Sequence, residues 1–259
     1  MTASQPPKPR VAFFDFTSCE GCQLTVVDSL ETHPELLDAV DIVEFREAIT
    51  EVAETYDVAF IEGSCTRESD EQRLRAIRAK AKFVVALGSC AHLGGINAIK
   101  NRMPPNDVHV AVYGRDAKAF DTYATRPISA VIPIECTIPG CPINAQEFLQ
   151  LVTFLMQGRT PDLIDYPVCI ECKLAETACV YLLGRTCLGP ITRAGCAAIC
   201  PSNGYQCVGC RGLTSNANLA SLRQVMAEHG LTPSDVENSL SMFLTWQLSQ
   251  RHDEEKHRA

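Results

Sequence analysis

Short apolar segments alternate with segments of helical character through the first half of the chain. The apolar segments are rich in Val, Ile and Phe, have polar or Gly-containing flanks, and span residues 11–16, 41–45, 58–62, 83–87 and 130–134. Helices are predicted between them over residues 21–30, 69–80 and 144–156. Strands that alternate with helices favour a doubly wound parallel sheet, so the pattern predicts an α/β fold. For residues 101–126, the pattern predicts only a loop or short irregular elements.

The second half of the chain begins with a dense run of cysteines. Eight of the 14 cysteines lie between Cys169 and Cys210. They form a C-x2-C-x6-C-x7-C run of Cys169, Cys172, Cys179 and Cys187, and a C-x3-C-x6-C-x2-C run of Cys196, Cys200, Cys207 and Cys210. Each run supplies the four thiolates that one metal site needs. Helices are predicted after this run, over residues 218–229 and 232–249.

These patterns predict two domains. Residues 1–160 are expected to contain the parallel sheet. Residues 161–259 are expected to form a small cysteine-rich domain with two metal sites, followed by the C-terminal helices.

The other six cysteines follow predicted strands of the first domain: Cys19, Cys22, Cys65, Cys90, Cys136 and Cys141. The carboxyl ends of parallel strands meet at one edge of a sheet, so the sequence predicts a third site there. Cys19 and Cys22 form a CxxC at a helix start, where the helix dipole favours thiolates, and Cys90 and Cys141 lie in glycine-containing turns. We assign these four to the site. For Cys65 and Cys136, an extra ligand and an ordinary buried cysteine both stay open.

Charge and hydropathy narrow the class of protein. The formal charge of -8, with no dense Lys/Arg stripe, argues against nucleic acid as a partner. No export signal and no uninterrupted apolar run of about 18 residues is visible, so we expect a cytoplasmic protein. Metal thiolates explain many cysteines in a reducing compartment better than disulfides do. No glycine-rich phosphate loop is present, so nicotinamide or flavin would bind to other subunits.

Five motifs, in this order, give the chain a resemblance to the small, electron-transfer subunit of nickel-iron hydrogenases. They are FTSCEGCQLTVVD, the EGSC turn, GSCAHLGG, IPGCPIN and the CLGPITRAGC tail with its CP and CxxC, and they span about Val11 to Gly212. The resemblance implies a flavodoxin-like first domain that holds a proximal iron-sulfur cluster on Cys19, Cys22, Cys90 and Cys141. It also implies a distal cluster on the run from Cys169 to Cys187 and a medial cluster on the run from Cys196 to Cys210.

Two positions favour one branch of this family. Periplasmic members have His where this chain has Cys169, and usually Pro where it has Cys200, so the resemblance implies three four-iron clusters here. The chain is similar to the cytoplasmic multimeric branch, such as the delta subunit of sulfhydrogenase. In that branch, electrons would pass between a nickel-iron site on a separate large subunit, which oxidises H2 or reduces protons, and an acceptor-binding subunit for flavin, NAD(P) or another acceptor.

Four further residues have both a functional and a plain interpretation. Glu20 lies between two ligands and would relay protons, or would be a carboxylate that interacts with the helix dipole. His92 would hydrogen-bond to a cluster or only to its local surroundings. Arg193 and Arg211 would offset the charge of reduced clusters, or pair with carboxylates.

Two alternative functions remain at this point. The first is an electron-transfer subunit like that of respiratory complex I, without hydrogenase activity. The second is a zinc-binding interaction module. Zinc ribbons usually have paired CxxC knuckles at both ends of a site, whereas each run here has one CxxC, and zinc would leave the cysteines of the first domain unexplained.

Overall fold

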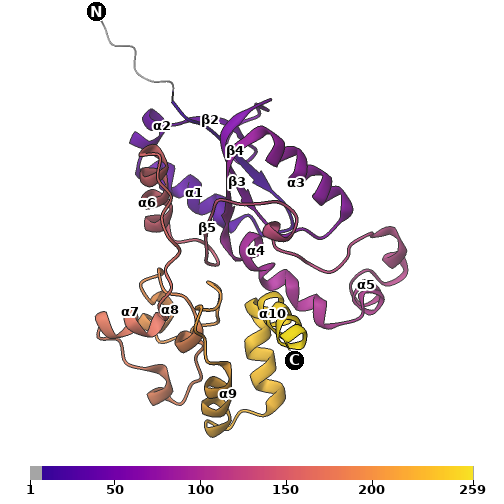
Figure 1. Ribbon diagram of the computed structural model, residues 1–259, viewed down its shortest axis with the longest axis vertical. Helices are drawn as coiled ribbons and strands as arrows, with labels where there is room; N and C mark the ends of the chain where they lie inside the picture. The colour runs from indigo at the N-terminus through magenta and orange to yellow at the C-terminus, as the bar shows by residue number, and fades with distance from the viewer. Residues whose placement is uncertain (1–7, 259) are drawn as a thin grey trace, which may run out of the picture.

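The computed structural model describes residues 8–258 and contains a five-stranded sheet in which all neighbours are parallel (Figure 1). The strand order is β2-β1-β3-β4-β5. The strands are β1 (Arg10–Asp15), β2 (Asp41–Phe45), β3 (Tyr56–Glu62), β4 (Ala81–Leu87) and β5 (Cys136–Ile138). This order is that of flavodoxin-like folds. The predicted fold class is therefore confirmed.

Helices connect the strands and form most of the second half of the chain. The part of the chain up to residue 160, which the sequence predicts as the first domain, contains α1 (Gly21–Thr32), α2 (Glu35–Ala39), α3 (Glu68–Lys80), α4 (Gly88–Leu93), α5 (Pro105–Tyr113) and α6 (Ala145–Met156). The predicted second domain contains α7 (Val168–Leu174), α8 (Ile199–Ser202), α9 (Leu219–Glu228) and α10 (Pro233–Arg258). Short 3-10 helices are η1 (Gly95–Arg102), η2 (Gly114–Ala119), η3 (Ile128–Ala130), η4 (Val180–Leu183) and η5 (Gly189–Ile191). The stretch 101–126 is thus largely helical.

Both faces of the sheet are covered, because successive side chains of each strand point to opposite sides. Val11 and Phe13 of β1 pack in one apolar cluster with residues of α1 and α6, while Ala12 and Phe14 pack in the other with residues of α3. Figure 1 shows α1 and α6 on one side of the sheet and α3 on the other. The carboxyl ends of the strands are left free of these helices.

The fifth strand lies later in the chain than predicted. The apolar pattern predicts a strand over residues 130–134, but β5 spans Cys136–Ile138. Pro133 explains the difference, because proline has no N–H to donate to a sheet. The Glu135 carboxylate accepts a hydrogen bond from the Val84 backbone N–H at 2.6 Å, and β5 pairs with β4 from there. Cys136 therefore begins the strand instead of following it.

The second domain is attached to the first by the guanidinium of Arg211, which is 1% exposed. It donates two hydrogen bonds of 2.8 Å to the Glu147 carboxylate of α6 and one of 2.8 Å to the Pro139 carbonyl. On the other side it donates to the Ala194 carbonyl at 2.7 Å. Gly195 gives it room, since a Cβ there would overlap the guanidinium. Arg211 therefore satisfies polar groups of both domains at once.

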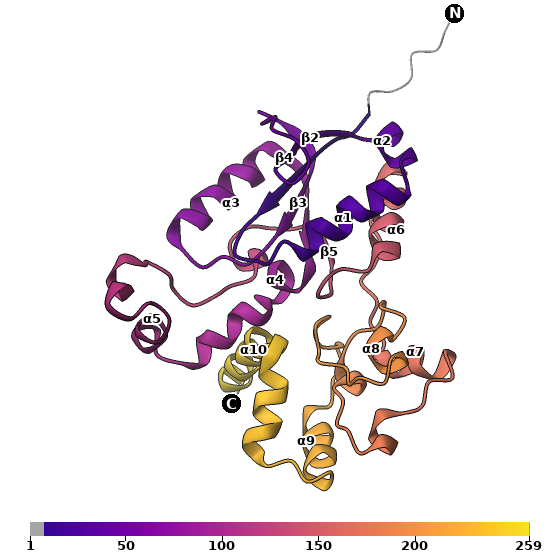
Figure 2. The ribbon, with the colours of Figure 1, turned by 180° about the vertical axis from the view of Figure 1, so that it is seen from behind.

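The C-terminal helix provides a second attachment. α10 lies against η1 and α4 (Figure 2). Arg102 of η1 donates to the Ser241 hydroxyl at 2.6 Å, and the Gln247 side chain accepts from the Leu213 backbone N–H at 2.9 Å. The chain therefore returns to the first domain after it has formed the second.

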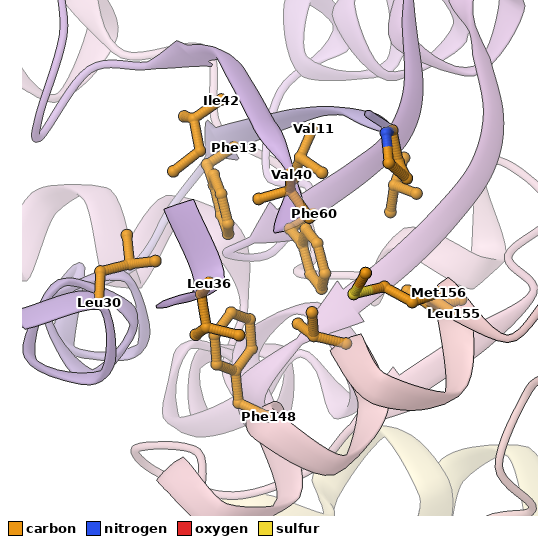
Figure 3. A pocket seen from close by; sticks show the side chains of 13 residues that line it. Val11, Phe13, Leu30, Leu36, Val40, Ile42, Phe60, Phe148, Leu155 and Met156 are labelled. Carbon is orange, nitrogen blue, oxygen red and sulfur yellow. The ribbon is translucent and has the colours of Figure 1, made fainter. Parts of the chain in front are cut away.

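A cavity of about 50 Å³ lies between the sheet, α1, α2 and α6 (Figure 3). Its lining is entirely apolar and includes Phe13, Phe60, Phe148 and Met156. None of its lining side chains can donate a hydrogen bond. Within residues 8–258, no helix combines the length and apolar character needed to cross a membrane.

We predict that Arg211→Met lowers the free energy of unfolding by about 3 kcal/mol, because it leaves a carboxylate and two carbonyls without their buried partner. The matched control is Arg223→Met, which breaks an ion pair with Glu237 on the surface and should cost less than about 1 kcal/mol. Urea midpoints of the two cluster-loaded variants, measured without oxygen, check this. Equal midpoints would contradict it.

Candidate metal centres

Four cysteines predicted for the first site meet at the carboxyl edge of the sheet. Cys19 follows β1, Cys22 is in the first turn of α1, Cys90 is in α4, and Cys141 is in the turn after β5. Burial raises the pKa of Cys90 to about 12, with further contributions from Cys141, Glu62 and Cys19. Burial also raises the pKa of Cys22, and Glu62, Cys90 and Cys141 raise it further. These mutual effects place the four thiols next to one another.

The backbone at the start of α4 forms one wall of this proximal set. Gly88 has a φ of +81°, a conformation that favours glycine, and a Cβ on it would overlap the Cys22 thiol. Asn97, from η1, places its amide nitrogen 3.8 Å from the Cys90 sulfur. Only a residue without a side chain fits between α4 and the Cys22 thiol.

Glu62 belongs to this site, although we did not single it out from the sequence. Its side chain is 2% exposed at the end of β3 and accepts hydrogen bonds from the backbone N–H groups of Cys22 at 3.2 Å and Gln23 at 2.9 Å. Burial raises the pKa of this carboxyl. The sequence does contain an indication of this role. An acidic residue directly follows the apolar run VAFI, at a position of a buried strand where an apolar residue is expected. Glu62 holds the first turn of α1, and with it the position of Cys22.

The first cysteine run of the second domain also comes together. Cys169 and Cys172 lie in α7, Cys179 precedes η4, and Cys187 precedes η5. Burial raises the pKa of Cys169 to about 11, and the thiols of Cys187, Cys172 and Cys179 add to the rise. The structure therefore brings together the four residues that were predicted to form the distal set.

The second run forms another group around α8. Burial raises the pKa of Cys210 to about 12, and the thiols of Cys196, Cys141 and Cys200 contribute. Burial also raises the pKa of Cys207, and the Cys210 thiol is among the groups that add to this rise. The predicted medial set is thus assembled, and Cys141 of the proximal set is one of its neighbours.

Consecutive sets lie next to one another. The Cys207 N–H donates a hydrogen bond to the Cys187 sulfur at 3.2 Å, which joins the medial set to the distal set. The Cys141 thiol adds to the rise in the pKa of Cys210, and the hydroxyl of Ser89, next to Cys90, donates to the Cys210 carbonyl, so the proximal set lies beside the medial set. The three sets therefore follow one another in the order proximal, medial, distal.

The donor set fits iron-sulfur clusters. Each set offers four thiols, which is the full ligand complement of a four-iron cluster. The thiols of a set are close enough to raise one another's pKa, but within the described residues no three His, Cys, Asp or Glu side chains are close enough to hold a single ion. A cubane cluster separates its four ligands more widely than one zinc ion does.

Cys65 and Cys136 lie apart from the three sets. Cys65 is completely buried on the α3 side of the sheet, with its sulfur 3.2 Å from the Tyr123 hydroxyl. Cys136 lines a cleft of about 630 Å³ between β5, α6 and residues 160–164. Burial raises the pKa of Cys136 to about 12, and the negative charge of Glu135 raises it further.

The structure also locates the four residues that had two interpretations. Glu20 is the N-cap of α1, with a φ of 64° and no capping hydrogen bond from its side chain. Arg193 pairs with Asp165, and Arg211 pairs with Glu147. His92 is partly buried with its Nε2 atom in the interior, and burial, together with Arg193 and Arg211, lowers its pKa to about 4.

Comparison with known proteins identifies the family to which the chain is similar. A family model described as NADH ubiquinone oxidoreductase, 20 Kd subunit, matches residues 19–155. Sulfhydrogenase 2 subunit delta of Pyrococcus furiosus is 33% identical over 92% of this chain and 100% of its own length. A subunit of the F420-non-reducing hydrogenase vhu of Methanococcus voltae is 31% identical over 91% of this chain and 95% of its own.

Solved structures give the same result for the fold. A chain of an NAD+-reducing [NiFe]-hydrogenase in the H2-reduced state is 25% identical, with a TM-score of 0.54 over 60% of this chain and 95% of that one. A chain of the Ni-Fe-Se hydrogenase from Desulfomicrobium baculatum shares the fold at 18% identity, with a TM-score of 0.54 over 79% of this chain and 94% of its own.

These relatives are hydrogenase subunits, and they support a hydrogenase-associated electron-transfer role within an oxidoreductase assembly. The resemblance that the five sequence motifs indicated is confirmed. The chain belongs to the family of the NADH ubiquinone oxidoreductase 20 Kd subunit, as one of its nickel-iron hydrogenase small subunits.

Proposed function

We propose that this protein relays single electrons through three four-iron clusters, between a nickel-iron site on a separate large subunit and an acceptor-binding subunit. The observation that carries the proposal is the row of three thiol sets, in which the Cys207 N–H bonds to the Cys187 sulfur and the Cys141 thiol lies beside Cys210. A single structural zinc site needs no such row. A relay needs consecutive sites close together.

The residues of the chain have three tasks in this function. Twelve thiolates would bind the clusters, which supply one-electron redox chemistry over a range of roughly -700 to +450 mV. Backbone N–H groups and the Asn97 amide donate to ligand sulfurs, and such donors tune each potential. Burial excludes water from Cys22 and Cys207, which lie in the interior.

The proximal set is the side that a large subunit would cover. Cys19 and Cys141 are both exposed. Leu24, one turn after Cys19, is 52% exposed, and Ile96, just after α4, is 51% exposed. Large apolar side chains around exposed metal ligands indicate a surface that a partner buries. The second partner would meet the exposed Cys179 of the distal set.

The second candidate is a complex I-like subunit without hydrogenase activity, and the name of the matching family favours it. That match ends at residue 155, before all eight cysteines of the second domain. The sulfhydrogenase delta relative, in contrast, covers 92% of the chain. The extent of the match therefore favours the hydrogenase role. A cytoplasmic location stays a prediction.

Isolation of the chain with its bound partners tests the proposal. We expect a nickel-containing partner, hydrogen-dependent dye reduction, and about twelve iron and twelve sulfide per small subunit. Dye reduction without nickel or hydrogen dependence would support the complex I-like alternative. A colourless, zinc-containing protein would overturn both redox functions.

Gly88→Ala should remove the proximal cluster, because the added methyl group occupies the space of the Cys22 thiol. Iron should fall by about one third, with the proximal signal lost and the other two retained. Gly114→Ala is the control: its φ is also positive, at +55°, but no atom lies within 4 Å of the new methyl. Equal iron loss in both variants would attribute the effect to backbone strain and contradict this prediction.

Cys65→Ser and Cys136→Ser should leave the proximal cluster spectrum unchanged. The Cys65 thiol contacts Tyr123, and Cys136 lines a separate cleft, so neither is placed as a fifth ligand. Electron paramagnetic resonance of the reduced variants checks this. An altered proximal signal in either variant would assign that cysteine to the cluster.

A further inference from the structure

The imidazole of His92 has a nitrogen that no group of the chain satisfies. Among the described residues, three buried side-chain nitrogen atoms have no hydrogen-bond partner, namely Gln23 Nε2, His92 Nε2 and Arg193 Nε. Native proteins pair nearly all such groups. A buried imidazole nitrogen without a partner points to a group that the polypeptide does not supply, and in the tautomer with the proton on Nε2 that group is an acceptor.

The position of His92 in α4 determines which way it faces. At 100° per residue, it lies about 60° around the helix from Ser89 but about 160° from Cys90. The Ser89 hydroxyl donates to the Cys210 carbonyl, so this side of α4 faces the second domain. Leu93 also lies there, with its side chain 3.1 Å from a Cβ placed on Gly212. His92 thus points away from the proximal ligand and toward the segment that contains Cys210.

The residues around His92 on that side are themselves donors. Arg193 and Arg211 are close enough to lower the pKa of His92. A guanidinium donates hydrogen bonds and accepts none, so neither side chain can satisfy His92 Nε2 in the tautomer that carries its proton there. Arg211 directly follows Cys210, and its charge opposes the rise that burial causes in the pKa of Cys196. The acceptors expected at this place are the sulfurs of the medial site.

We propose that His92 donates a hydrogen bond from Nε2 to a sulfur of the medial cluster and so raises the reduction potential of that cluster. This inference rests on the proposed three-cluster function. A hydrogen bond to sulfur stabilises the more negative, reduced state, and its removal lowers the potential. A residue of the sheet domain thereby tunes a site whose four ligands all belong to the second domain.

The test is a redox titration, followed by electron paramagnetic resonance, of the complete complex with His92→Phe. This variant keeps an aromatic ring but has no donor. We expect the medial midpoint to shift to lower potential while the proximal and distal midpoints stay in place. His92→Gln retains a donor and should restore at least part of the shift. His109→Phe is the control, because His109 of α5 bonds to Thr122, away from the cysteine sets.

A second readout does not depend on the variants folding correctly. With 15N-labelled histidine in the wild-type complex, pulsed resonance should detect a histidine nitrogen coupled to the reduced medial cluster. No such coupling, or an unchanged midpoint in His92→Phe, would overturn the proposal and assign Nε2 to a buried water. Equal shifts in His92→Phe and His92→Gln, or shifts of all three midpoints, would overturn it in favour of a packing effect. Failure of the underlying function is distinguishable, because the wild-type complex would then lack three cluster signals.

Discussion

The buried guanidinium of Arg211 is the interaction on which the arrangement of the metal centres depends. It binds Glu147 and Pro139 of the first domain and Ala194 of the second. Pro139 is two residues before a proximal cysteine, and Arg211 itself follows a medial cysteine. This side chain therefore helps to set the spacing between the proposed proximal and medial sites, and the cost of its burial is offset because its guanidinium donates to a carboxylate and to two carbonyls.

Burial of the thiols has a consequence for folding. In the apo chain, the low-dielectric surroundings raise the pKa of residues such as Cys90 and Cys210 to about 12, so their thiols are neutral. Metal binding requires thiolates and must release these protons. Cys187 and Cys207 of the second domain belong to a small apolar cluster, so we expect the folding of that domain to be coupled to cluster insertion more strongly than that of the sheet.

Patterns that are local in the sequence were sufficient for the strands up to β4, for α1, α3 and α6, and for the two cysteine runs, but not for α2, α4 or α5. Pro133 should have excluded residues 130–134 as a strand, but the run of apolar residues on either side of it outweighed that signal. The contacts that order the three sets could not be predicted. Arg211 and Glu147 are 64 residues apart, and the proximity of Cys141 to Cys210 depends on how two domains pack, which no spacing rule encodes. Glu62 was missed because an acidic residue after an apolar run is also typical of an exposed residue that ends a strand, and the sequence does not distinguish the two cases.

The return of α10 to η1 has a mechanical meaning. Two domains held only by Arg211 would be able to pivot about that point, but the Arg102–Ser241 bond holds them at a second, distant point. Two separated anchors suppress hinge bending. In the proposed relay, the gap between the proximal and medial sites would therefore vary little, and the difference in potential would govern the passage of charge across it.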